Sequence, residues 1–233
     1  MANFDFCLNF QQNIKYFPKT LGVLYNLNMT HVFMSALVAG ANSGQVVSFP
    51  TDTIPALAVR PDYAELIFTL KQRSNNKPLI LMGSFPSSLW SYVKGTDAEL
   101  EIWQQVAKHY WPGALTLVLP ASDKVPAAMN PTDPTTIGLR VPDSRVAIAI
   151  LSQTGPLATT SANVSGKPPL HTMPEIEAEF PEVLTLHPTE SKELEERHPY
   201  TQGAPSTVVK WTGDGWQILR QGAVSFDCSL SKG

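Results

Sequence analysis

Hydrophobic residues recur at helical spacing in four stretches of the chain. The clearest stretch runs from Asp97 to Tyr110, where Leu100, Trp103, Val106 and Ala107 fall on one face of a helix. The same spacing, ended by glycine or proline, predicts further helices over residues 31–41, 63–71 and 144–153.

Short apolar runs between these stretches predict strands. The expected strands cover residues 45–50, 79–82, 115–119, 137–141, 157–160, 183–186, 207–211 and 216–219. A Thr-Gly-Asp-Gly turn at 212–215 joins the last two as a hairpin. Helices and strands alternate and then strands cluster, which predicts an α/β (α+β) fold with a mixed sheet.

The 233 residues fit one large domain, and 43% of them are hydrophobic, enough for a sizeable core. We expect an N-terminal tail of unknown role over residues 1–28, one domain over 29–226 and a C-terminal tail over 227–233. No apolar stretch approaches the roughly 20 residues of a membrane helix, and no secretory signal opens the chain. A soluble protein without a membrane partner is therefore expected.

The distribution of charge is more informative than the net charge of −3. Residues 44–170 carry ten Lys/Arg and nine Asp/Glu, whereas residues 171–200 carry two and eight, which predicts a solvated acidic helix face and loop there. Bulk electrostatic coating of nucleic acid is excluded, so any anion site must focus a few cations. Two cysteines near opposite ends show no metal or redox spacing, which predicts a reducing, cytoplasmic location.

The common templates for phosphate binding and hydrolysis are absent from the sequence. No Gly-x-Gly-x-x-Gly or Gly-x4-Gly-Lys-Ser/Thr loop occurs, nor does a Gly-x-Ser-x-Gly nucleophile elbow. The five histidines have no paired spacing typical of a metal site. The chemistry must therefore come from less familiar segments.

Two candidate segments lie in the first third of the chain. Pro50-Thr51-Asp52-Thr53 follows a predicted strand, where α/β sheets bind ligands, although the same residues suit a helix N-cap. Lys71, Arg73 and Lys77 place three cations within seven residues. These cations fit a phosphate group, and equally the negative end of a helix dipole.

Two more candidates lie towards the C-terminus. Hydroxyl and amide side chains fill the segment 159–167, so it can either circle a polyanion or form an ordinary turn. Ser206 and Arg220 flank the predicted hairpin, where Arg220 on its own could be a surface charge. Each segment is a weak signal alone, and their order along the chain is the specific one.

Seven motifs in this order resemble the YrdC-like family, the threonylcarbamoyl-AMP synthases of tRNA modification, over about residues 33–224. They are Phe-Pro-Thr-Asp-Thr at 49–53, Lys-Gln-Arg at 71–73 with Lys-Pro-Leu at 77–79, Trp-Pro-Gly-Ala-Leu-Thr at 111–116, Gly-Leu-Arg-Val-Pro at 138–142, Ser-Ala-Asn-Val-Ser-Gly at 161–166, Pro-Ser-Thr-Val-Val at 205–209 and Ile-Leu-Arg at 218–220. The resemblance implies one twisted mixed sheet with helices around a large basic concave cavity. It also implies that L-threonine, bicarbonate and ATP give threonylcarbamoyl-adenylate and pyrophosphate, for modification of tRNA A37.

Matched positions imply roles for individual residues. Thr51, Arg140 and Thr159 would hold threonine, with Arg140 gripping its carboxylate. The residues expected to contact ATP are Lys71, Arg73, Lys77, Thr136, Ser161, Asn163, Ser206 and Arg220. Mg²⁺ would accompany ATP, and no residue is expected to act as a covalent nucleophile.

The chain departs from the family pattern at the expected substrate wall. Ile54-Pro55-Ala56 stands where an aliphatic residue, an aromatic residue and glycine are usual, and Met82 and Pro169 replace a common His and Ser. Pro55 also removes a backbone N–H. Two alternatives therefore stay open: a double-stranded RNA or tRNA-binding protein, and a nucleotide-binding regulatory paralogue without synthase activity.

Overall fold

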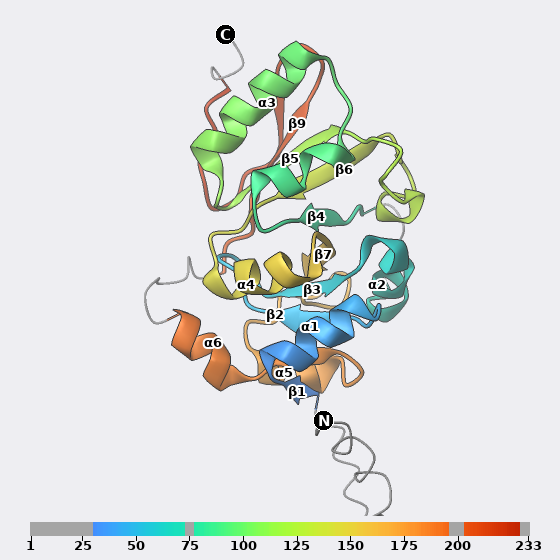
Figure 1. The fold of residues 1–233 in the computed structure, drawn as a ribbon, viewed down its shortest axis with the longest axis vertical. Helices are drawn as coiled ribbons and strands as arrows, with labels where there is room; N and C mark the ends of the chain where they lie inside the picture. The colour runs from blue at the N-terminus through green and yellow to red at the C-terminus, as the bar shows by residue number, and fades with distance from the viewer. Residues whose placement is uncertain (1–29, 73–76, 196–202, 229–233) are drawn as a thin grey trace, which may run out of the picture.

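The computed structural model describes residues 30–72, 77–195 and 203–228. Its framework is a ten-stranded sheet in the order β1-β8-β2-β3-β7-β4-β6-β5-β9-β10 (Figure 1). The strands are β1 (His31–Val32), β2 (Val47–Phe49), β3 (Ala56–Val59), β4 (Ile80–Met82), β5 (Leu115–Pro120), β6 (Thr136–Arg140), β7 (Leu157–Ser161), β8 (Leu184–Leu186), β9 (Thr207–Trp211) and β10 (Trp216–Arg220). The sheet contains parallel pairs such as β4–β6 and antiparallel pairs such as β5–β6, which confirms the predicted mixed sheet.

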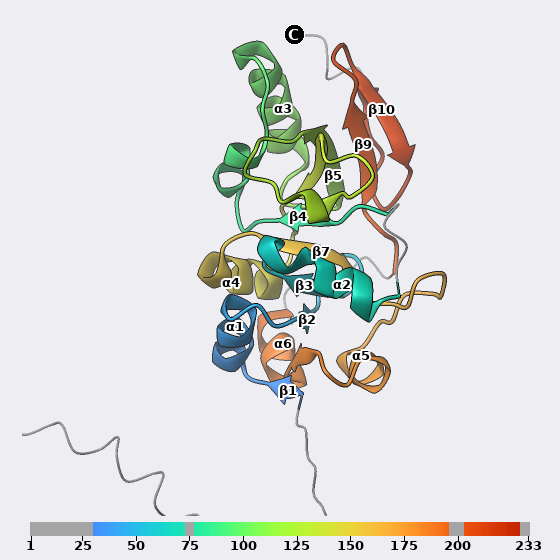
Figure 2. The ribbon, with the colours of Figure 1, turned by 90° about the vertical axis from the view of Figure 1, so that its right-hand side faces the viewer.

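The helices lie on the two sides of this sheet. They are α1 (Met34–Asn42), α2 (Ala64–Leu70), α3 (Asp97–Tyr110), α4 (Arg145–Thr154), α5 (Met173–Glu179) and α6 (Pro188–Glu195). Figure 2 shows α1, α3 and α4 on its left and α5 on its right. Among the residues described, no helix combines the length and apolar character needed to span a bilayer.

Local sequence explains where the longer helices begin and end. Thr96 and Glu99 form a reciprocal capping box at the start of α3, while Trp103, Val106 and Ala107 are buried along it. The Ser144 hydroxyl accepts a hydrogen bond from the backbone N–H of Ala147 at the start of α4. Gly155 ends that helix with a φ of +74°, a conformation that favours glycine.

Three groups of buried side chains hold the sheet and helices together. The largest lies where α2 and α3 cover β4, β5 and β6, around Trp103 and Leu117. A second joins α1 and α4 to β2 and β3 around Leu37 and Phe49, and a third lies beneath α5 around Ile176. All three share the one sheet, so the described residues form a single folded unit.

The structure differs from the predicted elements in two places, at the start of the described residues and in the middle of the sheet. The helix predicted over 31–41 is wrong at its beginning, because His31–Val32 forms β1 and pairs in parallel with β8. The strand β3 was not predicted at all, although Ala56–Val59 is completely buried and pairs with both β2 and β7. An Ala-Leu-Ala-Val run between two prolines shows neither the helical spacing nor the alternation of a half-buried strand, so the hydrophobic pattern did not predict it.

The acidic segment forms α5, β8 and α6 in the described part of the chain. Glu177 differs from the predicted solvated face, because it is half-buried and its carboxylate accepts a hydrogen bond from Thr30 and pairs with His31 at 3.0 Å. This acidic side chain therefore anchors β1 to α5.

Candidate functional site

The loop between β2 and β3 is folded around the hydroxyl of Thr51. This hydroxyl donates to the carbonyl of Ile54 at 2.8 Å and accepts from the backbone N–H of Thr53 at 3.2 Å. Thr51 is 1% exposed. No helix begins here, so the loop is a compact turn between antiparallel strands and the N-cap interpretation is wrong.

Arg140, the last residue of β6, reaches this loop from 87 residues further along the chain. Its guanidinium donates to the Thr53 hydroxyl at 2.8 Å, to the Asp52 carboxylate at 2.7 Å and to the carbonyl of Gly113 at 3.1 Å. The Arg140 and Asp52 side chains are only 5% and 13% exposed. Three of the five guanidinium N–H groups thus bond to described residues, which leaves two for a ligand carboxylate.

Lys71 joins the segment that follows β7. Its ammonium group donates to the carbonyl of Ser161, to the amide oxygen of Asn163 at 3.2 Å and to the Thr160 hydroxyl at 3.3 Å. The Ser161 hydroxyl also donates to the Asn163 amide oxygen, at 2.6 Å. Lys71 is the C-cap residue of α2, but at 1% exposure it is a buried cation held by oxygen atoms rather than a solvated charge at a helix end.

Ser206 and Arg220 meet at the base of the β9–β10 hairpin. Arg220 donates to the carbonyl of Ser206 at 2.8 Å, and the Ser206 hydroxyl lies 2.9 Å from that of Thr116 on β5. Burial, and then the positive charge of Arg140, lower the pKa of the Arg220 guanidinium from its ordinary value. Arg220 is an exposed residue of β10, so it is a surface cation that its hydrogen bonds to Ser206 hold at the base of the hairpin.

The sheet register connects these groups. Ser161 lies beside Ala56, Thr159 lies beside Ile80, and Ile80 lies beside Gly138 in the next strand. Thr159 is 2% exposed, and its hydroxyl donates to the carbonyl of Ile80. Arg140 lies level with Met82 and Leu157, so Thr159 and Ser161 are two and four residues further along β7 than the position beside Arg140.

Three further residues, Thr136, Lys77 and Arg73, were predicted to contact ATP. Thr136 begins β6, four residues and about 13 Å from Arg140 at its other end, and its hydroxyl bonds to Asp133 and Asn130. Lys77 is exposed and lies three residues before β4. Arg73 lies outside the described residues.

A cavity of about 780 Å³ opens beside Thr51 and Thr53. Pro50 and Pro55 complete the wall formed by this loop, and the opposite wall comes from the start of α5, from α6 and from Gly203. That opposite wall consists of His171, Thr172, Met173, Pro174, Pro188, Ser191 and Lys192. Of the described residues predicted to bind threonine or ATP, Thr51 alone lines this cavity. Pro55 adjoins the others, since its carbonyl accepts from the N–H of Ala162, next to Ser161.

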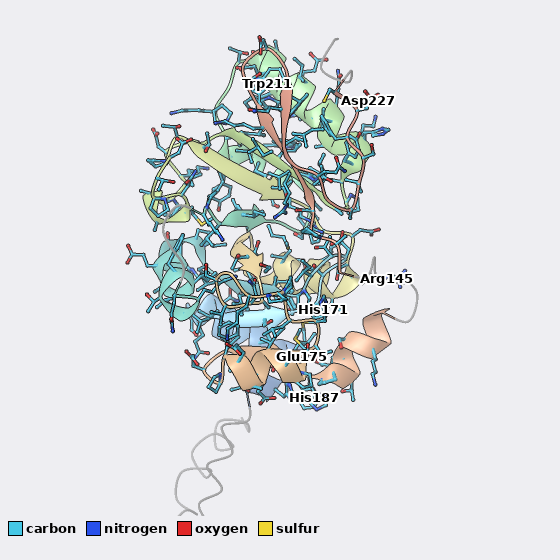
Figure 3. All side chains as sticks on the ribbon, turned by 180° about the vertical axis from the view of Figure 1, so that it is seen from behind. Arg145, His171, Glu175, His187, Trp211 and Asp227 are labelled. Carbon is cyan, nitrogen blue, oxygen red and sulfur yellow. The ribbon has the colours of Figure 1, made fainter. Side chains whose placement is uncertain are left out.

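The sequence did not single out the wall formed by α5 and α6. Its residues belong to the acidic segment, whose composition pointed to solvent exposure. The helices α5 and α6 precede and follow β8, which is inserted in the sheet between β1 and β2. This strand pairing, which local sequence does not reveal, brings both helices to the Thr51 loop. Figure 3 labels His171 and Glu175 where the chain enters α5.

Comparison with known proteins shows that the chain is similar to threonylcarbamoyl-AMP synthases and to Sua5 structures. A family model for Sua5, YciO and YrdC, described as telomere recombination, matches residues 41–222. A threonylcarbamoyl-AMP synthase of Vibrio vulnificus is 31% identical over 193 residues, which cover 81% of this chain and 98% of that protein. The P. abyssi Sua5 structure complexed with L-threonine superposes with a TM-score of 0.68 and 28% identity, covering 81% of this chain and 54% of that one.

Some relatives are much longer. A threonylcarbamoyl-AMP synthase of Bacillus subtilis is 37% identical over 131 residues, which cover 53% of this chain and 36% of that protein. The chain thus spans about a third of the length of the Bacillus protein and about half of the archaeal one.

Proposed function

The chain belongs to the Sua5/YciO/YrdC family, and we propose that it is an L-threonylcarbamoyladenylate synthase, a nucleotidyltransferase that serves tRNA modification. Its substrates are L-threonine, bicarbonate and ATP. Among these, threonine has the most direct support, because a structural relative is described as complexed with L-threonine. The adenylate product is in the names of the relatives, whereas bicarbonate and the connection to tRNA rest on the family resemblance of the sequence motifs.

The observation that carries the proposal is the contact between Lys71 and the Ser161–Asn163 segment. These groups are about 90 residues apart in the chain, yet the ammonium group lies within hydrogen-bond distance of Ser161 and Asn163. All three N–H groups of the ammonium are used in bonds to Ser161, Asn163 and Thr160. Lys71 therefore fixes the shape of the Ser161–Asn163 segment, and its buried positive charge favours a triphosphate bound beside that segment.

The residues divide into two groups by chemistry. Thr51, Thr159 and Arg140 hold threonine, and the two remaining N–H groups of Arg140 bind its carboxylate. Lys71, Ser161, Asn163, Ser206 and Arg220 bind ATP; Arg73, Lys77 and Thr136 stay predictions for the same ligand.

The reaction needs positioning more than a strong base. The threonine nitrogen adds to the bicarbonate carbon and water leaves, giving a carbamate; a carbamate oxygen then attacks the α-phosphorus and pyrophosphate leaves. Fixed cations stabilise the charge that develops on the pyrophosphate. Mg²⁺ enters with ATP: it is ordinarily bound by substrate phosphates and one or two carboxylates, and the described residues hold no cluster of three or more metal-binding side chains.

Pyrophosphate release tests the proposal. The purified chain is incubated with ATP and Mg²⁺ in degassed buffer, with threonine and bicarbonate added singly and together. Release only when both are present, with threonylcarbamoyl-adenylate detected by mass spectrometry, is the expected result. Release that ignores either co-substrate would contradict the assignment, as would no release.

A further inference from the structure

The wall of the cavity opposite the Thr51 loop carries positive charge and hydroxyl groups. Lys192 on α6 and His171 before α5 are the ionisable side chains among its described lining residues, and both are basic. Thr172 and Ser191 add hydroxyls beside them. No carboxylate belongs to these lining residues, and Lys192, the hydroxyls and the His171 ring offer hydrogen-bond donors to an anion.

Two described carboxylates near this wall, Glu175 of α5 and Glu190 of α6, make structural contacts. Glu175 accepts the backbone N–H groups of His171 and Thr172 at 2.9 and 3.0 Å, which closes the capping box of α5. Glu190 accepts the backbone N–H of Met34. These bonds fix the acids to the backbone, so they cap helices and tie α6 to α1.

Gly203 lines the cavity together with His171, which is exposed. Gly203 has a φ of +80°, a conformation that favours glycine.

We infer that Lys192 and His171 form an oxyanion subsite, which rests on the proposed function and extends it. The subsite binds either the carboxylate derived from bicarbonate or a phosphate of ATP, while the threonine carboxylate is bound at Arg140. The cavity volume of about 780 Å³ lies within the range of small-molecule sites and exceeds what a single amino acid fills. The hydroxyl groups of Thr51 and Thr53 then line one wall of the site, and Lys192 and His171 line another.

The chemistry of the intermediate gives this arrangement a purpose. A threonine carbamate has two carboxylates on the two sides of one nitrogen, so it needs a second cationic group in addition to Arg140. The same wall would instead meet the triphosphate if ATP reached past Pro55, whose carbonyl is bonded to Ala162 beside Ser161. Both ligands present planar or tetrahedral oxyanions, to which lysine and histidine donate hydrogen bonds.

The test compares a Lys192→Met/His171→Gln double variant with a matched control. Lys108→Met/His109→Gln removes an exposed lysine and histidine from α3, away from the cavity. We expect the double variant to raise the KM of bicarbonate or of ATP about tenfold or more, because a charge-assisted hydrogen bond is lost. The KM of threonine and the unfolding temperature should stay close to those of the wild type.

Each outcome decides the inference. A rise confined to bicarbonate identifies the carboxylate as ligand, and a rise confined to ATP identifies the phosphate. Constants within twofold of the control for both, or a rise for threonine alone, overturn the subsite. If the wild type releases no pyrophosphate, the proposed function fails. Calorimetric titration with inorganic pyrophosphate and with bicarbonate then decides: binding lost only in the double variant keeps the subsite, and equal or absent binding overturns it.

Discussion

Arg140 and Asp52 form a nearly buried ion pair, so they serve stability as well as ligand binding. Replacing Arg140 by methionine leaves the Asp52 carboxylate buried without this cation, which costs roughly 3–5 kcal/mol in such pairs. Urea unfolding should show this loss in Arg140→Met. The Asp52→Asn/Arg140→Met variant should recover part of it, because the buried negative charge is gone. Equal stability of the single and double variants would show that the pair is not coupled.

The role of Arg140 in binding is better tested with Arg140→Lys, which keeps the charge. Lysine lacks the planar pair of N–H groups that grips a carboxylate. We expect the KM of threonine to rise about 10- to 100-fold, since hydrogen bonds to a charged group contribute about 1.5–3 kcal/mol, and the KM of ATP to change little. Unchanged threonine kinetics would refute the assigned role.

Lys71 should act on the other substrate. Lys71→Met removes the ammonium group that joins Ser161 to Asn163, and we expect ATP affinity to fall about tenfold or more. Threonine affinity should stay within twofold of the wild type, measured by calorimetry. Lys108→Met on α3 controls for the loss of a positive charge, and equal losses for both ligands would contradict the division of the site.

The residues of the site were predictable to different degrees. Lys71, Ser161 and Asn163 lie in polar motifs at the ends of apolar runs, and the structure brings them into contact. The partners of Arg140 were not predictable, because Asp52 and Thr53 reach it only through the order of strands β2, β3, β7, β4 and β6. His171 and Lys192 gave no signal, since a lone histidine and a lysine among glutamates are typical of a solvated surface.

At the scale of elements, the start of α3 is held to the sheet by one carboxylate. Glu99 closes the capping box with Thr96 and accepts a hydrogen bond from the Trp211 indole at 3.0 Å. Hydrogen bonds from the Thr96 backbone, and then from the Trp211 indole, hold the pKa of Glu99 below its ordinary value. A lowered pKa in the folded state stabilises the protein above the unfolded pKa, and this stability is lost as the pH falls through the folded value.

Glu99→Gln should therefore lower the free energy of unfolding at neutral pH and matter less in acid. We expect a deficit of about 0.3–1 kcal/mol at pH 7, typical of a charge near a helix N-terminus. This deficit should shrink as the pH falls below about 4.3, where the unfolded carboxyl becomes protonated. Urea unfolding at pH 7, 5 and 3, with Glu101→Gln as control, measures it; a deficit that stays constant over this range would contradict the assignment.

The helices and strands that the sequence predicted have either a clear hydrophobic period or a clear boundary at glycine, proline or a capping residue. The predicted helix over 97–110 matches α3 because its cap, its apolar face and its end all lie in the local sequence. β1 and β3 were missed for a different reason. Their strand character depends on pairing with β8 and with β2 and β7, which are partners distant in sequence, and tertiary contacts override weak local preference.

At the scale of the whole molecule, one sheet carries both halves of the proposed site. The residues proposed to hold threonine lie in the β2–β3 loop, in β6 and in β7. Those proposed to bind ATP lie around α2, β7 and the β9–β10 hairpin, and the strands between them are continuously paired. Since the three buried clusters rest on this sheet, opening one half exposes core that belongs to the other. Unfolding should then be cooperative across the described residues.

Scanning calorimetry should accordingly show one transition that either ligand raises. A ligand at 100 times its dissociation constant adds about 2.7 kcal/mol of stability, and for a protein of this size each kcal/mol shifts Tm by about 2–4 °C. Threonine and ATP, added separately, should each move the whole transition, and together they should move it further. If a ligand shifted only part of a split transition, the two halves of the sheet would unfold independently. The site that they share would then lack the rigid framework needed to hold the two substrates in position for reaction.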